Sequence, residues 1–125
     1  MVNTRQKGQL LEKYVCEQII AKGLDDRARP SYNSGATNTE KADIWCSIML
    51  LGQNVGIEVK NQNTIKIPEW WKQVKKLESL SREPVLVFKV KNAPLGDTLA
   101  TVYLDTFLEL MKENKDLREK LKAYE

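Results

Sequence analysis

The sequence predicts an α/β protein, with a mixed central β-sheet flanked by helices in one domain over residues 1–125. Apolar residues recur at helical spacing over residues 4–22, which indicates an amphipathic helix. Residues 55–61 alternate between apolar and other side chains, as a β-strand does. Helical and extended patterns then alternate, so the expected order is a helix, three strands, a helix, two strands and a helix.

The expected first helix has one apolar face, formed by Leu10, Leu11, Tyr14, Val15 and Ile19. Asn3 or Thr4 can cap its start, and Gly23 is a suitable terminator. The following residues, 25–38, are rich in turn formers and leave room for a short strand near residues 27–29.

Two further strands are expected over residues 41–51 and 55–61, joined by a tight turn at Gly52-Gln53-Asn54. Because side chains alternate between the faces of a strand, Glu58 and Lys60 must point to the same side. The apolar residues of that strand point to the other side, toward a core.

The second half of the chain predicts a helix over residues 68–80, with Pro68 in its first turn, and strands over 85–90 and 99–104. Of Trp70 and Trp71, one is expected in the core and the other over a neighbouring surface. Thr106 and Glu109 have the spacing of a capping box for a last helix that runs toward Tyr124. Its apolar stripe is expected to pack on the sheet of the same chain, with a dimer helix as the alternative: Phe107, Met111, Asn114, Leu117 and Leu121.

The composition excludes several classes of function. The chain has no histidine, which rules out Ser-His-Asp and Cys-His catalysis and histidine-ligated zinc. Cys16 and Cys46 form no CxxC pair and are interpreted as free thiols in a reducing compartment. No apolar run approaches the ~18 residues that span a bilayer, so we expect a cytoplasmic protein without a membrane segment. The net charge of +3 permits a polyanionic partner.

The triplet Glu58-Val59-Lys60 has the residues that metal-assisted phosphodiester hydrolysis needs. Asp43 precedes Glu58 on the other strand of the expected hairpin, so the two carboxylates can form a cup for Mg²⁺, or Mn²⁺ in its place. The Val59 carbonyl is a plausible further ligand, and Glu12 lies at the edge of the first helix's apolar stripe. The simpler interpretation is a surface ion pair between Glu58 and Lys60.

Five motifs resemble the archaeal-type Holliday junction resolvases of the PD-(D/E)xK nuclease superfamily, over about the first 90 residues. They are Arg5-Gln6-Lys7-Gly8 with Glu12, Arg29-Pro30 with Ser34-Gly35, Lys41-Ala42-Asp43-Ile44, Ile57-Glu58-Val59-Lys60, and Ile65-Lys66-Ile67 followed by a helix with Gln73 and a strand over residues 84–89. Three features depart from the family: Ala42 stands where the superfamily name has proline, Glu40 adds an acid between Gly35 and Asp43, and the last helix is longer.

This resemblance implies a restriction-endonuclease-like core, αβββαβ, with an extra strand and a C-terminal helix. It implies a homodimer that nicks four-way junction DNA in pairs. Glu12, Asp43 and Glu58 would then serve the metal, with Lys60 and Ser34 as further catalytic residues. The residues expected to contact DNA are Arg5, Lys7, Arg29, Gly35, Lys66, Lys72 and Gln73.

Three alternatives stay open at this point. The chain is alternatively a general PD-(D/E)xK nuclease of phage, restriction or repair type that acts on flap or duplex DNA. It is otherwise a non-catalytic DNA-binding module on the same fold. A third alternative is a protein-interaction domain that uses a surface around Trp70 and Trp71.

Overall fold

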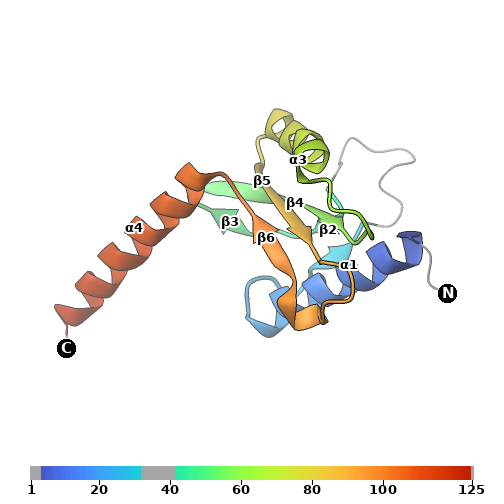
Figure 1. Ribbon diagram of the computed structural model, residues 1–125. Helices are drawn as coiled ribbons and strands as arrows, with labels where there is room; N and C mark the ends of the chain where they lie inside the picture. Colours follow the sequence, from blue (N-terminus) through green and yellow to red (C-terminus); the bar gives the residue numbers. More distant parts are fainter. Residues whose placement is uncertain (1–3, 32–41, 125) are drawn as a thin grey trace.

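The computed structural model describes residues 4–31 and 42–124, and it has the predicted α/β architecture with helices flanking a mixed sheet (Figure 1). The described helices are α1 (Thr4–Ala21), α3 (Ile67–Lys75) and α4 (Leu104–Lys122), with the short 3-10 helices η1 (Lys76–Leu80) and η2 (Leu95–Asp97). The described strands are β1 (Arg29–Pro30), β2 (Ile44–Trp45), β3 (Met49–Leu50), β4 (Gln53–Lys60), β5 (Glu83–Phe88) and β6 (Leu99–Thr101).

The central sheet has the strand order β3-β4-β5-β6. β4 and β5 run parallel and are connected through α3, whereas β3 and β6 lie antiparallel at the two edges. β1 and β2 form a separate antiparallel pair. A hydrogen bond of 2.9 Å from the Asp43 N–H to the Ile57 carbonyl holds the start of β2 against β4.

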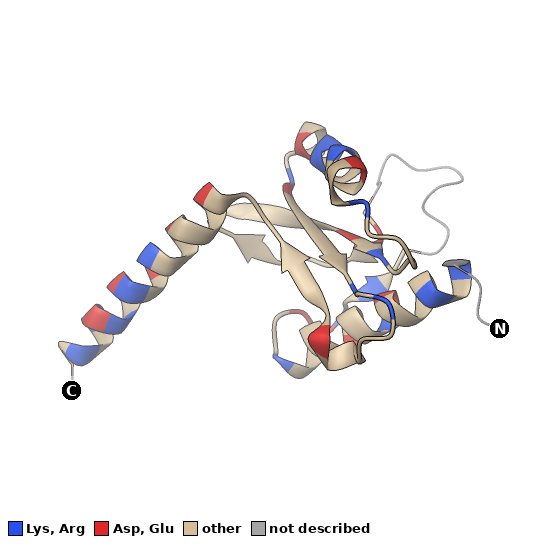
Figure 2. Cartoon of the chain, in the orientation of Figure 1, with Lys and Arg blue, Asp and Glu red and all other residues tan. Residues whose placement is uncertain are grey.

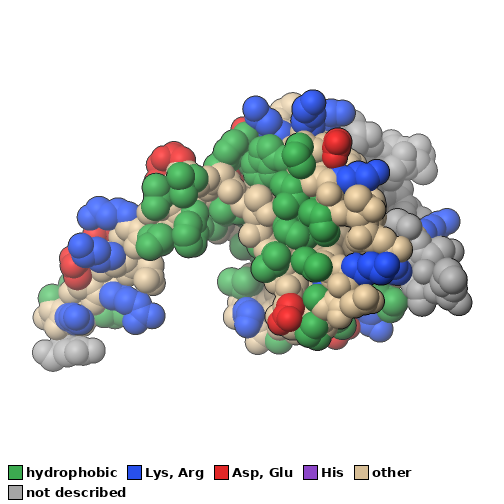
Figure 3. All heavy atoms as spheres, viewed as in Figure 1, with side chains coloured by type: hydrophobic (Ala, Val, Ile, Leu, Met, Phe, Trp, Pro, Cys, Tyr) green, Lys and Arg blue, Asp and Glu red, His purple; other side chains and the backbone are tan. Residues whose placement is uncertain are grey.

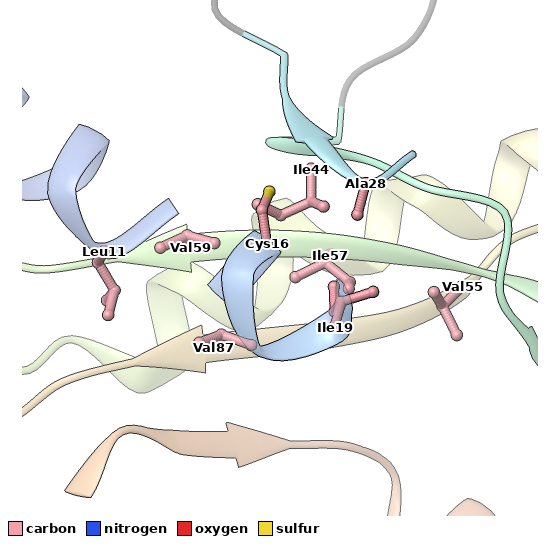
Figure 4. Packing of buried hydrophobic residues seen from close by; sticks show 9 residues of the cluster. All are labelled: Leu11, Cys16, Ile19, Ala28, Ile44, Val55, Ile57, Val59 and Val87. Carbon is pink, nitrogen blue, oxygen red and sulfur yellow. The ribbon is translucent and has the colours of Figure 1, made fainter. Parts of the chain in front are cut away.

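Helices cover both faces of the sheet, α1 on one face and α3 on the other. The cluster on the α1 face is shown in Figure 4 and comprises Leu11, Cys16, Ile19, Ala28, Ile44, Val55, Ile57, Val59 and Val87. The cluster on the α3 face comprises Ala42, Trp70, Val74, Leu77, Leu86 and Phe88. Because Glu58 is the register partner of Leu86 on the parallel strand, its side chain lies on the α3 face of β4.

The first helix and its termination agree with the prediction to within one residue. Gly23 adopts a φ of +73°, and the Leu24 N–H donates to the Ile19 carbonyl at 3.1 Å, as in a glycine-terminated helix. Val55 and Ile57 face the core as the alternation of β4 predicts, and β4 extends two residues further back than expected.

The single strand expected over residues 41–51 is wrong, because residues 46–48 interrupt it between β2 and β3. The Asp25 carboxylate accounts for the break. It accepts hydrogen bonds from the Ser47 N–H at 2.7 Å and from the Arg27 N–H at 3.0 Å. The Ser47 amide therefore bonds to a side chain and not to a neighbouring strand. The short strand expected at 27–29 lies at β1 instead.

The turn between β3 and β4 consists of Leu51 and Gly52, not of residues 52–54 as predicted. Both residues have a positive φ, 53° for Leu51 and 84° for Gly52, which is the pattern of a two-residue type I′ hairpin turn. Residues 53 and 54 pair with β3 and belong to β4.

The helix expected over residues 68–80 is α-helical only as far as Lys75 and continues as the 3-10 helix η1. Pro68 lies in its first turn, as predicted. The two following strands are shifted or shortened relative to the prediction: β5 begins and ends two residues earlier, and β6 ends three residues earlier.

The two adjacent tryptophans have different environments. Trp70 is 4% exposed and packs in the α3-face cluster, with its ring centroid 6.0 Å from that of Phe88. Trp71 is half-buried and meets Tyr103 edge-on at 5.1 Å. The prediction of one core and one covering tryptophan is confirmed.

The last helix, α4, differs most from the prediction. It begins at Leu104, and the expected capping box is wrong because the Thr106 hydroxyl donates to the Glu83 carboxylate at 2.5 Å. This contact holds the helix start at the end of the sheet, and the helix then projects away from the sheet (Figure 1). Its stripe is therefore exposed and does not pack on the sheet of the same chain: Phe107, Met111, Asn114, Leu117 and Leu121. Neither α4 nor any other described helix combines the length and apolar character needed to cross a bilayer.

Candidate active site

Asp43 is held against β4 by two hydrogen bonds that flank Glu58. Its backbone N–H donates to the Ile57 carbonyl at 2.9 Å, and its Oδ2 accepts from the Val59 N–H at 2.8 Å. The strand residues on either side of Glu58 thus fix both the backbone and the carboxylate of Asp43. Asp43 and Glu58, predicted to be close, are brought together in this way even though the strand before β4 is broken.

The Glu58 carboxyl group is buried, with 4% of the residue exposed. Burial is the main reason that its pKa rises to about 9, and the negative charge of Asp43 and a hydrogen bond shared with the Asp43 carboxylate raise it further. Lys60 acts in the opposite direction, because its positive charge favours ionised Glu58. At neutral pH the Glu58 carboxyl therefore keeps its proton and shares it with Asp43.

Glu12 faces the same group of charges from α1. It is half-buried, and its pKa rises to about 7, first because of burial and second because of the charge of Asp43. Its charge also raises the pKa of Glu58. Three acidic side chains from α1, the start of β2 and β4 therefore repel one another in a poorly hydrated region, which is the electrostatic environment that a cation relieves.

The oxygen atoms of Asp43 and Glu58 are the hard donors that Mg²⁺ prefers. In the described part of the chain, no three His, Cys, Asp or Glu side chains are grouped closely enough to hold a metal ion together. The Val59 N–H points at Asp43, and the Val59 carbonyl leaves the strand on the same side.

Lys60 is the last residue of β4 and is half-buried. Strand alternation puts its side chain on the same face as Glu58, whose pKa it lowers. Its carbonyl accepts a hydrogen bond from the Lys89 N–H at 3.3 Å, which keeps the ends of β4 and β5 together. The site thus has a fixed cation beside its buried acids.

A surface groove of about 730 Å³ is lined by four lysines and one acidic residue, Glu17, and we call it the lysine groove. Its four lysines come from α1 and from the residues that follow β5: Lys7, Lys13, Lys89 and Lys91. Asn61, which follows Lys60 in the chain, lines the groove and donates from Nδ2 to the Lys7 carbonyl at 3.1 Å. The groove therefore lies at the carboxyl ends of the parallel strands β4 and β5, where Asn61 and Lys89 follow them.

Of the predicted DNA-contacting residues, the structure places Lys7 in the lysine groove, where its Nζ donates to the Asn63 Oδ1 at 2.6 Å. Arg5 is exposed at the start of α1, and Lys66, Lys72 and Gln73 are exposed at or on α3. Figure 2 shows Lys and Arg positions, in blue, on both α1 and α3. Arg29 is exposed too, with its guanidinium 4.3 Å from the centre of the Trp45 ring. Ser34 and Gly35 lie outside the described residues.

Four residues that line the lysine groove were not predicted as site residues: Lys13, Asn61, Lys89 and Lys91. A usable signal was present, since Asn61 and Lys89 directly follow the two strands that prove to be parallel neighbours. Parallel strands end at the same edge of a sheet, and this edge commonly binds ligands.

The two cysteines are free, as predicted. Burial raises the pKa of both Cys16 and Cys46 to about 11. At neutral pH both therefore remain protonated, so neither is an activated nucleophile.

Comparison of the chain with family models, with curated proteins and with solved structures gives no match. The resemblance to the resolvases therefore rests on the sequence motifs. The structure contributes the relative placement of the residues in those motifs, as far as they are described.

Proposed function

We propose that the protein is a divalent-metal-dependent endodeoxyribonuclease with a restriction-endonuclease-like core of the PD-(D/E)xK type. The observation that carries the proposal is the pair of Asp43 and Glu58, whose carboxyl groups share a hydrogen bond beside Lys60 where solvent hardly reaches. Two carboxyl groups this close keep one proton at neutral pH, and a divalent cation in its place stabilises both as carboxylates.

Each residue of the site has a separate role in the proposed hydrolysis. Mg²⁺, or Mn²⁺ in its place, would activate a water molecule and neutralise charge on the phosphate. Asp43 and Glu58 bind the ion, and the Val59 carbonyl is a third oxygen on the same side of the strand. Lys60 orients the attacking water or stabilises the charge that develops on the phosphate. Glu12, which couples electrostatically to Asp43 and Glu58, would support the bound metal from α1.

The lysine groove supplies the binding surface for the DNA backbone. Its four lysines carry the charge opposite to that of phosphate, and Asn61, which directly follows Lys60 in the chain, is one of its lining residues. Arg5 on α1, Lys66 before α3 and Lys72 on α3 are further exposed basic residues that can contact phosphate. By the resemblance to the resolvases, the substrate is a four-way junction that a homodimer nicks on two strands.

A second candidate function is DNA binding without catalysis. It is favoured by the absence, in the part of the chain that the structure describes, of three acidic, histidine or cysteine side chains close enough to share a metal ion. A protein of this kind would use the lysine groove and leave the buried acids as a protonated pair. A nuclease that acts on flap or duplex DNA would instead use the same acidic site with a different substrate.

The test is a cleavage assay on a four-way junction, a flap and a linear duplex of matched sequence, with Mg²⁺, Mn²⁺ or EDTA. The variants Asp43→Asn, Glu58→Gln and Lys60→Met change the site with little change in volume. The matched controls Glu109→Gln and Lys115→Met change exposed residues of α4. The proposal predicts metal-dependent cutting that each site variant lowers at least about a hundredfold and that the controls leave unchanged.

The outcomes separate the candidates. Paired nicks confined to the junction support the resolvase, and equal cutting of all three substrates leaves a nuclease without junction specificity. Tight DNA binding with no cutting under Mg²⁺ or Mn²⁺ would overturn the nuclease in favour of the binding module. Cutting that survives in Asp43→Asn and Glu58→Gln would exclude the proposed site.

A further inference from the structure

The outer face of α4 carries large apolar side chains that the rest of its own chain leaves uncovered. Phe107 is 51% exposed, Leu117 is 52% exposed and Leu121 is 65% exposed. Figure 3 shows apolar side chains gathered over the start of this helix, where it leaves the sheet, and mainly charged side chains further along the visible face. A protruding helix with such a face is unusual in a monomer, since an exposed apolar surface of this size marks an interface.

These residues follow the repeat of a coiled coil. Apolar or uncharged residues recur at alternating intervals of three and four, and together we call them the α4 seam: Phe107, Leu110, Asn114, Leu117 and Leu121. In heptad notation, Phe107, Asn114 and Leu121 occupy position a, while Leu110 and Leu117 occupy position d. Leucine at d is the preference of two-stranded parallel coiled coils.

Asn114 is the polar member of the seam and lies at its middle a position. On a helix that packs against the core of its own chain, an asparagine at this place would be a defect, because its amide would be buried without partners. In a two-stranded coiled coil the same residue pairs with its counterpart in the other helix and sets register and the number of strands.

The charges beside the seam are complementary between two copies. Glu113 occupies position g, and Arg118, five residues later, occupies position e. Position g of one helix faces the next position e of its partner when the two helices run parallel, so both Glu113–Arg118 contacts are attractive. The pair Lys112–Asp116 is bonded within one helix at 2.9 Å and lies outside the seam.

We propose that α4 is a dimerisation helix, on which a second copy of this chain packs through the α4 seam as a parallel two-stranded coiled coil. α4 has 19 residues, so the seam covers little more than two heptads. Helical pairs of this length are marginal on their own, and the dimer therefore dissociates in an accessible concentration range. The inference rests on α4 alone and does not depend on nuclease activity.

The first test is sedimentation equilibrium of the full-length chain over concentrations from about 1 to 500 μM, a range around the affinity expected for a short pair of helices. Leu117→Glu puts a charge at position d and should weaken dimerisation at least tenfold. The matched control is Leu108→Glu at position b, because Leu108 is 51% exposed on the same helix but lies outside the seam. Loss of the dimer in both variants would indicate general hydrophobic association, and a monomer at every concentration would overturn the proposal.

A charge exchange tests the pairing with little effect on folding, because both residues are exposed. Glu113→Arg and Arg118→Glu should each weaken the dimer, and the double variant should restore it. Circular dichroism of each variant shows whether α4 remains helical. Failure of the double variant to recover, with helicity intact, would exclude this parallel register.

A cysteine at position 121 tests the orientation. In a parallel pair the two copies of residue 121 lie opposite each other, so Leu121→Cys should form an intermolecular disulfide under mild oxidation. The unsubstituted chain, with Cys16 buried and Cys46 half-buried, is the control and should not crosslink. Crosslinking between Leu121→Cys and Phe107→Cys chains, without Leu121→Cys self-crosslinking, would show an antiparallel pair and overturn the proposal.

Discussion

The carboxylate of Asp43 accepts a hydrogen bond from the backbone N–H of Val59 at 2.8 Å, across 16 residues of sequence. This bond replaces one that a neighbouring strand would otherwise make with β4. It also fixes the Asp43 carboxylate next to Glu58, whose proton it shares. A side chain thus completes the backbone pairing of β4 and builds the acidic site in the same contact.

The shared proton makes the stability of the metal-free protein depend on pH. The pKa of Glu58 rises from its ordinary value of 4.5 to about 9, so above pH 4.5 the unfolded chain releases a proton that the folded chain retains. The contribution of Glu58 to the free energy of unfolding is complete below about pH 4.5 and is lost as the pH rises toward 9. Glu12, with a pKa of about 7, adds to the loss in the lower part of this range. Urea unfolding in EDTA should therefore give a lower free energy of unfolding at pH 8 than at pH 5.5.

The variant Glu58→Gln removes the titrating group and should reduce this pH dependence, with a clear gain in stability at pH 8. Glu109→Gln is the control and should keep the slope of the unsubstituted chain, because Glu109 is exposed on α4. If the free energy of unfolding changed equally with pH in the unsubstituted chain, Glu58→Gln and Glu109→Gln, the shared-proton arrangement would be contradicted.

The close placement of Asp43 and Glu58 was predictable because it depends on local patterns. The alternation of β4 fixes which side chains share a face, and the strand before it returns along the same edge. The end of α1 was predictable for the same reason, since Gly23 permits the left-handed conformation that terminates a helix.

The remaining features depend on contacts between distant residues. The break after β2 is caused by Asp25, which accepts a hydrogen bond from Ser47, 22 positions later. The lysine groove unites Lys13 of α1 with Lys91, which follows β5. The start of α4 is held by the bond from Thr106 to Glu83 and by the contacts of Tyr103 with Trp71 and Glu78, and nothing in a helical periodicity specifies which surface an apolar stripe will meet.

Divalent metal should reverse the pH dependence at the acidic site. An ion that binds Asp43 and Glu58 displaces the shared proton, so its affinity rises with pH, and Mn²⁺ should stabilise the protein more at pH 8 than at pH 6. At a Mn²⁺ concentration of about 100 times Kd, the free energy of unfolding should rise by about 2.7 kcal/mol. Thermal unfolding with and without Mn²⁺ measures it, and Asp43→Asn should abolish the gain. An equal shift in Asp43→Asn would mean that the metal binds elsewhere.

The lysine groove should make DNA binding strongly dependent on salt. Each lysine that contacts a phosphate releases counterions, so Lys91→Ala should weaken binding across all sequences and lower the slope of log K against log salt concentration by about 1. Lys115→Ala, on the exposed surface of α4, removes the same charge away from the groove. Fluorescence anisotropy between 50 and 200 mM NaCl, the range over which phosphate contacts change affinity most visibly, gives both slopes. If Lys91→Ala and Lys115→Ala gave the same slope of log K against log salt concentration, the lysine groove would not be the DNA-binding surface.

The turn between β3 and β4 offers a test of the backbone. Leu51 has a φ of +53°, a left-handed conformation that costs a residue with a branched side chain about 1 kcal/mol. Asparagine accepts this conformation and, followed by Gly52, forms the dipeptide that type I′ turns prefer. Leu51→Asn should therefore raise the free energy of unfolding by about 1 kcal/mol. The accompanying loss of apolar contact is small because Leu51 is already exposed. Leu51→Val, which is β-branched, should lower it. Urea unfolding at pH 6 measures both, and a Leu51→Asn protein less stable than Leu51→Val would show that the turn carries no such strain.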